Sequence, residues 1–394
     1  MLRPDWGWIL FFCFVLLFCA WVRWPLLAMV TVGVAVLTFV PRVRAFFIKK
    51  HQQIGRIGRM ICDWGFVVVV SLTIVVGLKS YFVDVFRLPS NSMEMTIGNG
   101  DMVVINKLIL GPRMRPDDPD AFYRAPGFRK VRHNDLIVFN FPEGDTLLVN
   151  RYFESYYSLK RQYGDMKTPG GQTLLGKTAY KSVTRRPKYI KRVVALPGDT
   201  VEMRDGTLWV NHRKVSVPPT SVRKYVDATG RGDSLLKALN IRPYNRYLQK
   251  QTPIYELSVG QVAQHAALDS HVVPLRVPAD QPDPYVFPHD FRWNVDHYGP
   301  VVVPARGMRL DVNERNILLY ARLIDVYEGN ELSVRGDEVL INGQVTRSYV
   351  CKMDYYWVMG DNQPHSFDSR YWGFLPANHI IGVSPLQFHV DGHE

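Results

Sequence analysis

Residues 188–210 have the sequence KYIKRVVALPGDTVEMRDGTLWV, and this stretch decides the class of fold. A run rich in Val, Ile and aromatic residues, 189–196, ends in Pro-Gly-Asp, and a second run, 207–210, follows Asp205-Gly206. Short runs of this composition bounded by Gly, Pro and Asp are typical of β-strands. The Asp-Gly pair favours a tight hairpin because both residues tolerate positive φ. The stretch therefore predicts antiparallel β structure.

The same pattern continues through much of the chain beyond residue 86. Residues 101–106 and 135–141 have the composition of strands, and Asn342-Gly343 is a second expected hairpin turn. The stretches VEMRDGTLWVNHRKV (201–215) and LSVRGDEVLINGQVT (332–346) resemble each other loosely. We therefore expect a mainly antiparallel β fold in which one hairpin design occurs twice.

The N-terminal part of the chain contains long apolar runs. The run from Trp8 to Val40 is broken only by Arg23 and Pro25, and a second extends over residues 65–78. A membrane-spanning helix needs about 20 apolar residues, so the first run is too long for one straight span. We expect two short helices that turn near Arg23 and Pro25, and a third that borrows flanking residues. The predicted transmembrane helices are 8–22, 25–40 and 64–83, within a membrane anchor of residues 1–85.

A basic loop, residues 41–60, separates the second and third predicted helices. It is rich in Arg and Lys and contains no acidic residue, the next one along the chain being Asp63. The positive-inside rule places such a loop in the cytoplasm. The third helix would then carry the rest of the chain to the extracytoplasmic face of a cytoplasmic (inner) membrane, as in a multi-pass protein. The alternative is a signal peptide over residues 8–20, although no small-residue cleavage site precedes a polar mature start.

The region beyond the apolar segments divides by composition. Residues 86–215 and 331–394 carry the strand-like runs and form the expected extracytoplasmic core. Residues 216–330 are rich in Pro and poorly periodic. We interpret them as a large insertion packed on the core, with a flexible accessory region as the alternative.

Bulk composition limits the classes of function without naming one. The chain of 394 residues is 47% hydrophobic and 21% charged, which is ordinary for a globular protein. Its net charge of +12 would fit nucleic-acid binding, but much of the concentrated basic charge lies in the 41–60 loop and no nucleic-acid-binding motif accompanies it. Cys351 stands alone beyond the apolar segments, so that region cannot hold an internal disulfide. No Cys/His cluster has the spacing of a metal site, and we expect neither metal nor cofactor.

Two segments contain residues suited to nucleophilic chemistry. In FRLPSNSMEMTIGNGDMVVINK (86–107), Ser90 and Ser92 flank Asn91. Serines beside Pro, Asn and Gly are usually turn formers. In KYIKRVVALPGDTV (188–201), Lys191 lies within a predicted strand. It can accept a proton only if burial lowers its pKa from about 10.4, and the alternative is an edge-strand lysine that faces water.

A third segment, YYWVMGDNQPHSFDSRYWGF (355–374), carries a turn at residues 360–362 followed by polar residues. Asp368 and Arg370 suggest an ion pair that fixes a loop. Ser366 could hydrogen-bond a neutral lysine amine and aim it, or it could simply cap a backbone amide.

These three segments, in this order behind a basic loop and an exit helix, resemble the sequence boxes of type I signal peptidases. The family patterns S-x-S-M-x-P-T, Y-I-K-R-x-x-x-L-P-G-D and G-D-N-x-x-x-S-x-D-S-R-Y-W-G are matched almost position by position, and HNDLIVFNFPEGD (133–145) matches a weaker box. The resemblance implies a membrane-bound serine endopeptidase that removes N-terminal signal peptides from exported precursors. It also implies a signal-peptidase-like, mostly antiparallel β domain that rests against the outer membrane face.

The resemblance also implies roles for individual residues. Ser92 matches the nucleophile and Lys191 the general base of a Ser/Lys dyad, which is an established variant of the Ser-His arrangement. Such a dyad hydrolyses its substrate through an acyl-enzyme. The other implied roles are the oxyanion hole for Ser90, orientation of the lysine for Ser366, and support of the site for Asp368 and Arg370.

Signal peptides carry small residues at an A-x-A-like cleavage site, and shallow apolar pockets would suit them. By resemblance, the candidates to line such pockets are Phe86, Leu88, Pro89, Met93, Ile97, Tyr189 and Ile190, with core packing as the alternative for each apolar residue. The expected partners are secretory precursor proteins and membrane lipid. Because Ser92 follows the third helix closely, we expect apolar surface around Met93 and Met95 to contact lipid.

The chain departs from the family pattern beside these positions. Met95 replaces the usual proline, Asn134-Asp135 replaces Gly-Asp, and residues 363–365 are Gln-Pro-His instead of the commoner Arg-Asp-Asn. These departures bear on the shape of the local loops.

Two rival functions remain: a Ser-His hydrolase in which His133 or His365 serves Ser92, and a catalytically silent membrane scaffold of the same fold. No Gly-x-Ser-x-Gly elbow supports the first.

Overall fold

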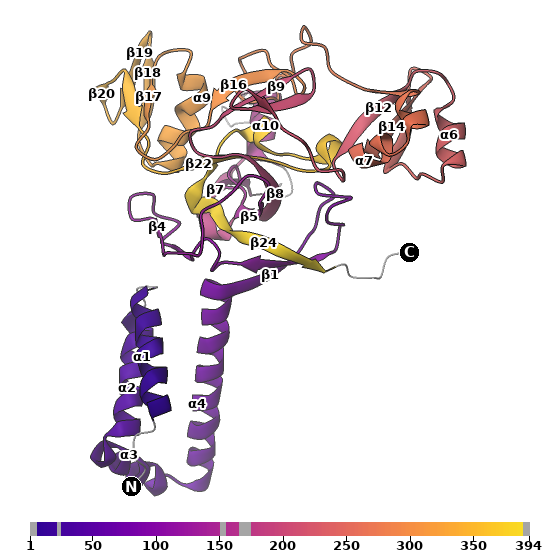
Figure 1. Ribbon diagram of the computed structural model, residues 1–394. Coiled ribbons are helices and arrows are strands. Elements are labelled where there is room, and N and C mark those ends of the chain that lie inside the picture. The colour runs from indigo at the N-terminus through magenta and orange to yellow at the C-terminus, as the bar shows by residue number, and fades with distance from the viewer. Residues whose placement is uncertain (1–5, 22–24, 150–154, 165–174, 389–394) are drawn as a thin grey trace.

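The structure is a computed structural model that describes residues 6–21, 25–149, 155–164 and 175–388 (Figure 1). A helical N-terminal part stands below a β-rich body, and one long helix leads from the first into the second. The N-terminal elements are α1 (Trp6–Trp21), α2 (Pro25–Phe39), α3 (Pro41–Gln53) and α4 (Arg56–Gly77), with the π-helical turn η1 (Leu78–Phe82) extending α4.

The N-terminal helices contact one another through aromatic side chains. The rings of Phe12 on α1 and Phe39 on α2 lie 5.6 Å apart, and Phe18 stacks on Phe82 at 5.0 Å, which ties α1 to the end of the long helix. Helix α3 is bent by 93° from α2 and lies across the lower ends of the other helices in Figure 1. This basic segment, which we described as a loop, is therefore mostly helical, and Pro41 at its first turn suits a helix start.

Helix α4 with η1, Arg56–Phe82, is long and apolar enough to cross a membrane. Helices α2 and α3 pass the same test only if the bent pair counts as one span, and α1 is shorter than a full span. The prediction of three transmembrane helices therefore stays a prediction. The predicted turn at Arg23 lies outside the described residues.

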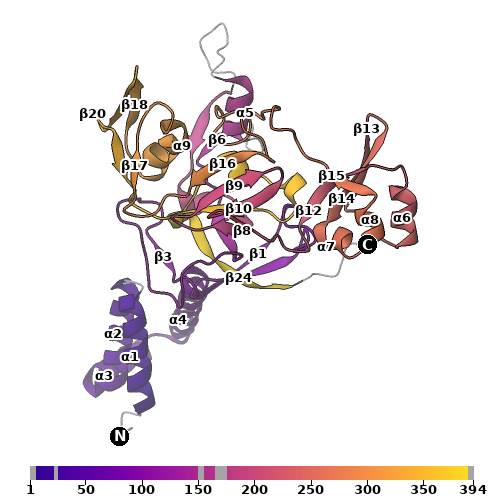
Figure 2. The same ribbon diagram turned by 45° about the horizontal axis from the view of Figure 1, so that its top comes forward.

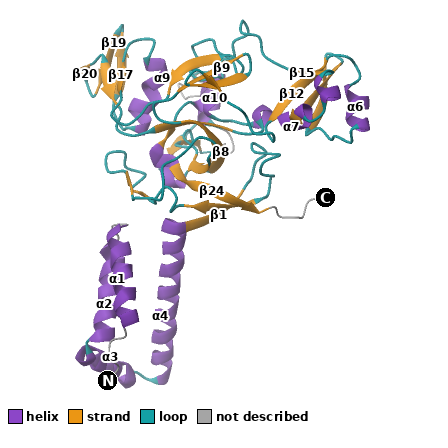
Figure 3. Cartoon of the chain, viewed as in Figure 1, coloured by secondary structure: helices purple, strands orange, loops and turns teal. Residues whose placement is uncertain are grey.

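A seven-stranded antiparallel sheet forms the centre of the β-rich body, in the order β1-β2-β24-β5-β8-β22-β23. Its strands are β1 (Val83–Arg87), β2 (Met102–Asn106), β24 (Ile380–Phe388), β5 (Leu136–Asn140), β8 (Lys188–Ala195), β22 (Tyr355–Met359) and β23 (Leu375–Pro376). The expected strands at 101–106, 135–141 and 189–196 are thereby confirmed. Strand β1 follows η1 directly, so the long helix feeds straight into the edge of this sheet (Figure 3).

Strand β22 is buried on both faces and links two hydrophobic clusters. Tyr355, Trp357 and Met359 enter one cluster, whereas Tyr356 and Val358 enter the other. This division follows from the pleat, which sends successive side chains to opposite faces. The residues after β22 therefore start from a rigid element.

A second antiparallel sheet has the strand order β11-β10-β9-β16. Its buried side chains belong to the same hydrophobic cluster as Trp357. Its strands are β9 (Thr200–Arg204), β10 (Thr207–Val210), β11 (Arg213–Lys214) and β16 (Tyr298–Val302). A small meander at one end of the body consists of β18 (Leu332–Arg335), β19 (Glu338–Ile341) and β20 (Gln344–Val345). The predicted turns are confirmed, because Asp205-Gly206 and Asn342-Gly343 each join paired strands with positive φ at both residues.

Residues 218–275 form a lobe at the opposite end of the body from the β18–β20 meander, and we call it the side lobe (Figure 2). Its sheet has the order β13-β14-β12-β15 and packs on three short helices around a small core of its own. Its elements are β12 (Val222–Asp227), α6 (Gly232–Ala238), β13 (Asn245–Gln249), β14 (Thr252–Ser258), α7 (Val259–Ala263), α8 (Ala266–Asp269) and β15 (Val272–Pro274).

The predicted insertion, residues 216–330, thus contains two differently packed parts. Strand β16, helix α9 (Ile317–Arg322) and the π-helical turn η3 (Leu323–Tyr327) contribute to the same hydrophobic cluster as Trp357. The side lobe does not belong to that cluster. The boundaries 86–215, 216–330 and 331–394 stay predictions.

Smaller elements complete the described part of the chain. They are β3 (Arg113–Met114), β4 (Tyr123–Arg124), β6 (Thr146–Leu148), α5 (Tyr156–Tyr163), β7 (Thr178–Tyr180), η2 (Val183–Arg185), β17 (Arg309–Asp311), β21 (Ser348–Val350), η4 (Gln363–His365), α10 (Ser369–Trp372) and η5 (Ala377–His379).

Candidate active site

Ser92 lies in the connection between β1 and β2. Backbone hydrogen bonds from Leu88 N to Asp101 O (2.9 Å) and from Gly100 N to Leu88 O (2.8 Å) close this connection at its base. Met93, the residue after the serine, has no exposed surface and packs in the hydrophobic cluster beneath the turn. Ser92 is therefore held between a closed loop base and a buried neighbour, and it is itself only 5% exposed.

Lys191 lies in the middle of β8, between β5 and β22. Its side chain is 2% exposed, and Nζ donates hydrogen bonds to Ser92 Oγ at 2.5 Å and to the Ile190 carbonyl at 3.0 Å. The ring of Tyr189 covers the amine from the same face of the strand, 5.6 Å away. The alternative of an edge-strand lysine facing water is wrong.

The electrostatics of the site make Lys191 easier to deprotonate than an exposed lysine. Burial lowers the pKa of Lys191 to about 8, against the attraction of the Asp368 carboxylate. Arg370 lowers this pKa further, while Asp361 raises it. An amine with such a pKa is neutral in a sizeable fraction of molecules and can then accept a proton from the hydroxyl beside it.

Ser366, Asp368 and Arg370 form one buried hydrogen-bonded group after β22. Ser366 Oγ donates to Asp368 Oδ2 at 2.6 Å. Arg370 pairs with both oxygens of the same carboxylate at 2.9 Å. Burial alone would raise the pKa of Asp368, but Arg370 and these hydrogen bonds hold it below its usual range. The ion pair suggested by the sequence is present.

The expected contact between Ser366 and Lys191 is not made directly. Within the described residues, no hydrogen bond joins Ser366 Oγ to Lys191 Nζ, and the Ser366 hydroxyl points its proton at Asp368. The alternative expected from the sequence, a serine that caps a backbone amide, is also not the contact found. Its role in orienting Lys191 stays a prediction.

Gly360 allows the two loops of the site to meet. A Cβ at this position would lie 2.5 Å from the Ser92 carbonyl oxygen and closer still to Ser366 Oγ. The next residues add hydrogen bonds, from Asn362 N to Ser92 O (3.1 Å) and from Asn362 Nδ2 to Asn91 O (2.9 Å). The turn at 360–362 therefore packs against the Ser92 turn and is hydrogen-bonded to its backbone.

Ser90 is exposed beside the nucleophile candidate, with its Oγ 3.3 Å from Ser92 Oγ. This position suits a hydroxyl that reaches a substrate at the mouth of the site. Its assignment to an oxyanion hole stays a prediction.

Sequence reasoning missed the role of Asp361. Its carboxylate is 3% exposed and accepts two hydrogen bonds from Arg192, at 2.8 and 2.6 Å, and one from Thr96 Oγ1 at 2.6 Å. Arg192 follows Lys191 in the strand, and Thr96 follows the Ser92 turn, so this carboxylate ties the three segments together. The available signal was one charged residue in each of two boxes, Arg192 in the box of Lys191 and Asp361 in the box of Ser366.

The two histidines considered as alternative bases for Ser92 have other partners. His133 Nε2 lies 2.7 Å from Asp199, and His365 Nε2 lies 2.7 Å from Glu256. Among the described residues, the side-chain hydrogen bonds of Ser92 go to Lys191 and Ser90. The geometry therefore disfavours a histidine base for Ser92.

The substrate-binding candidates differ in their exposure. Pro89 is exposed, and Phe86 and Tyr189 are half-buried. The other four are buried members of one hydrophobic cluster: Leu88, Met93, Ile97 and Ile190. Met93 has no exposed surface and cannot itself contact lipid, whereas Met95 is 43% exposed. Contact between lipid and the surface around these residues stays a prediction. The substrate roles stay predictions.

Two departures from the family pattern have local explanations. Asn134 has a φ of 68°, in the left-handed region that favours glycine and that Asn tolerates better than most residues. Met95 also has a φ of 68°, which a proline cannot adopt. The Ser92 turn of this chain therefore has a shape that the usual proline would forbid.

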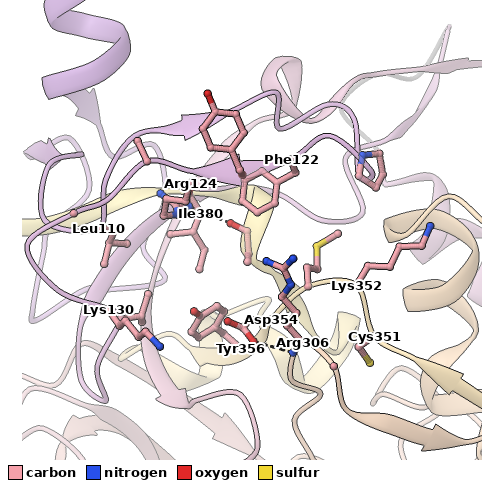
Figure 4. A pocket seen from close by; sticks show the side chains of 18 of the residues that line it. Leu110, Phe122, Arg124, Lys130, Arg306, Cys351, Lys352, Asp354, Tyr356 and Ile380 are labelled. Carbon is pink, nitrogen blue, oxygen red and sulfur yellow. Dashed lines mark hydrogen bonds between the residues drawn. The ribbon is translucent and has the colours of Figure 1, made fainter. Parts of the chain in front are cut away.

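A large cavity in the described part of the chain lies elsewhere (Figure 4). It has a volume of about 880 Å³ and is lined by residues near β3 and β4 and by the segment 350–356. Charged side chains of both signs surround it, including Arg306, Lys352 and Asp354. Neither Ser92 nor Lys191 lines it, so size alone does not locate the site.

Comparison with known proteins identifies the family of this chain. The model of the family described as "Signal peptidase, peptidase S26" matches residues 61–279 and 303–388, which is more than half of the chain. The chain belongs to this signal peptidase family. The match confirms the resemblance that the sequence boxes indicated, and it includes β1, β8, β22 and the loops that carry the proposed site residues.

Several relatives are proteins named signal peptidase I. That of Leptolyngbya laminosa is 30% identical over 25% of this chain and 55% of its own length. That of Haemophilus influenzae is 23% identical over 79% of this chain and 64% of its own length, and that of Pseudomonas aeruginosa is 24% identical over 55% and 69%. The chain thus spans less than two thirds of the first two relatives.

A crystal structure of a signal peptidase I from Enterococcus faecalis is also similar to this chain. It is 16% identical and covers 65% of this chain and 97% of its own, with a TM-score of 0.21.

Proposed function

We propose that this chain is a membrane-anchored endopeptidase that removes N-terminal signal peptides from exported precursor proteins, with Ser92 as nucleophile and Lys191 as general base. The observation that carries the proposal is the 2.5 Å hydrogen bond between Lys191 Nζ and Ser92 Oγ, both of them buried. Membership of the signal peptidase family supports the choice of substrate.

The reaction follows from this pair. Neutral Lys191 takes the proton of Ser92 as Oγ attacks the scissile carbonyl, and the resulting ammonium gives that proton to the leaving amine. The product is an ester between Ser92 and the signal peptide. Water then attacks this ester, with Lys191 taking a proton from the water. Lys191 returns that proton to Ser92 Oγ as the ester bond breaks, which releases the signal peptide with a free carboxyl group and restores the neutral amine. A Ser/Lys pair needs no acidic third member for these steps.

The negative charge on the substrate oxygen needs hydrogen-bond donors. The backbone N–H of Ser92 and the hydroxyl of Ser90 are the proposed oxyanion hole. Loss of one such donor commonly costs about 3 kcal/mol of transition-state stabilisation. Replacement of Ser90 by Ala should therefore lower kcat by about a hundredfold or more while leaving KM nearly unchanged.

The remaining site residues are proposed to act through the dyad. Ser366, Asp368 and Arg370 form one buried hydrogen-bonded group, and the charges of Asp368 and Arg370 influence the pKa of Lys191. Phe86, Pro89 and Tyr189 are the candidates with enough exposure to touch small substrate side chains directly.

The apolar N-terminal helices are proposed to anchor the protein in the cytoplasmic membrane, with α3 on the cytoplasmic side. The basic residues of α3 support this orientation. Helix α4 would then deliver β1 and the Ser92 turn to the outer face, where a membrane-inserted precursor presents its cleavage site.

The decisive experiment compares cleavage of a secretory precursor in detergent by the wild-type chain, Ser92→Ala and Lys191→Ala. We expect loss of cleavage in both variants and full cleavage by the matched controls Ser333→Ala and Lys214→Ala, which change exposed residues of other strands. Retained turnover in either site variant would overturn the dyad. Precursor binding without cleavage by the wild-type chain would instead favour the scaffold.

A further inference from the structure

The side lobe contacts the two loops of the proposed site at several points. Thr220 Oγ1 lies 2.6 Å from Thr96 Oγ1, just after the Ser92 turn, and Val222 N donates to the Asp361 carbonyl at 2.9 Å. The lobe is therefore docked on the site by polar contacts, in addition to its covalent connections.

One of these contacts reaches the residue next to the nucleophile. Asn91 Nδ2 donates to the hydroxyl of Tyr244 at 2.8 Å, although 153 positions separate the two residues in the chain. Asn91 stands between Ser90 and Ser92, which are the proposed oxyanion and nucleophile residues. A change in the backbone angles of Asn91 would move the Ser92 N–H.

Tyr244 is itself held by a histidine of the opposite loop. The rings of Tyr244 and His365 meet edge to face, with centroids 5.5 Å apart. His365 Nε2 forms a 2.7 Å hydrogen bond with Glu256 Oε2, whose side chain is 2% exposed. The Tyr244 backbone N–H donates to the Glu256 carbonyl at 2.8 Å. A buried carboxylate requires a hydrogen-bonding partner, and this requirement fixes the histidine.

The contacts close into a circuit that contains the Ser92 turn. Asn362 Nδ2 donates to the Asn91 carbonyl, and the His365 N–H donates to the Asn362 carbonyl at 3.1 Å. Starting from Asn91, the circuit passes through Tyr244, His365 and Asn362 and returns to Asn91. His365 directly precedes Ser366, so the loops of both site serines are included.

We propose that Tyr244, held by His365 and Glu256, is a positioning residue that fixes the Ser92 turn from the side lobe. The proposal rests on the proposed function in one respect, that Ser92 is the nucleophile. It gives the side lobe a role in catalysis, and it explains the histidine at position 365, where the family pattern more commonly has asparagine.

The test removes one hydroxyl. Tyr244→Phe keeps the ring against His365 but loses the hydrogen bond to Asn91, and kcat should fall about three- to tenfold with little change in KM. Tyr247→Phe is the matched control, because Tyr247 belongs to the same lobe and makes no hydrogen bond to the Ser92 turn. Asn91→Ala should give the same loss as Tyr244→Phe, and the double variant should be no slower than either single variant. Additive losses would overturn the proposal.

Hydrogen exchange of the intact chain in detergent provides a readout that needs no turnover. Backbone amides of residues 88–98 should exchange faster in Tyr244→Phe and Asn91→Ala than in the wild type, and at the wild-type rate in Tyr247→Phe. Unchanged exchange in Tyr244→Phe would overturn the proposal even if its activity fell. A wild-type chain that cleaves no precursor would overturn the proposed function alone, because the exchange measurement would still report on the contact.

Discussion

At the level of single residues, the proposed mechanism depends on the protonation state of Lys191. Burial lowers its pKa to about 8, and only the neutral amine can take the proton of Ser92. The rate of peptide cleavage should therefore rise as pH increases through about 8 and level off above it. The measurement is kcat/KM for a short signal-sequence peptide from about pH 6 to about pH 10.

Two outcomes bear on this pH profile. Lys191→Arg keeps a cation at the position, but arginine does not lose its proton in proteins, so this variant should be inactive at every pH. A wild-type rate that is independent of pH over the same interval would contradict a lysine base.

Asp368 and Arg370 give a prediction about stability. Asp368→Asn would leave the buried Arg370 cation without its carboxylate, and breaking a buried pair in this way typically costs about 3–5 kcal/mol. Denaturant unfolding in detergent should show this loss. Asp311→Asn, which changes an exposed aspartate of β17, is the control and should unfold as the wild type does.

The pH dependence of stability from the same carboxyl has a definite sign. Because the folded state holds the pKa of Asp368 below its usual range, its contribution is present above the unfolded pKa of about 3.9. It is lost as pH falls through the lower folded-state pKa. An unfolding free energy in which Asp368→Asn and wild type differ equally at neutral pH and well below pH 3.9 would contradict this assignment.

At the level of elements, the turn after β22 depends on Gly360. An alanine Cβ would collide with the Ser92 carbonyl oxygen and with Ser366 Oγ, and the Ser92 side of this contact is backbone, which cannot rotate away. Gly360→Ala should therefore destabilise the chain by about 1–3 kcal/mol and lower kcat more than it raises KM. Gly65→Ala in α4, where a Cβ meets nothing within 4 Å, is the control for the substitution itself. An active, stable Gly360→Ala chain would show that the turn can move.

Local elements were the most predictable part of the fold. The turns at Asp205-Gly206 and Asn342-Gly343 are encoded by residues that accept positive φ, and both join the expected strands. The similar stretches 201–215 and 332–346 each form a three-stranded meander. The helix over 41–53 was missed because charge patterning reports the side of the membrane rather than backbone conformation.

Long-range pairing was not predictable from the same signals. Strand β24 lies between β2 and β5, although it comes from the far end of the chain, and periodicity does not select a partner strand. For the same reason the sequence named Ser92, Lys191 and Ser366 through local motifs but gave no sign of Tyr244. The lone Tyr244 has no motif around it, and only the folded chain brings it to Asn91.

On the scale of the whole molecule, polar contacts join the end of the long helix to the β-rich body. Lys107, which directly follows β2, makes several of these contacts. Its Nζ donates to the carbonyl oxygens of Lys79 (2.5 Å) and Ser80 (3.3 Å) in η1, and its backbone N–H donates to the Phe82 carbonyl at 2.9 Å. A cation beside the last carbonyls of a helix is stabilising, and here it also joins the helix to the seven-stranded sheet.

Lys107→Met keeps the aliphatic stem but removes both side-chain hydrogen bonds to the helix end. We expect cleavage of a membrane-inserted precursor in vesicles to fall about three- to tenfold, because the Ser92 turn would no longer be held at a fixed height above the bilayer. A short soluble peptide approaches from water and does not depend on that height, so its cleavage should be unchanged. Lys214→Met, on the distant strand β11, should affect neither substrate. Equal losses for both substrates would mean that Lys107 supports the sheet and not the orientation of the body on its anchor.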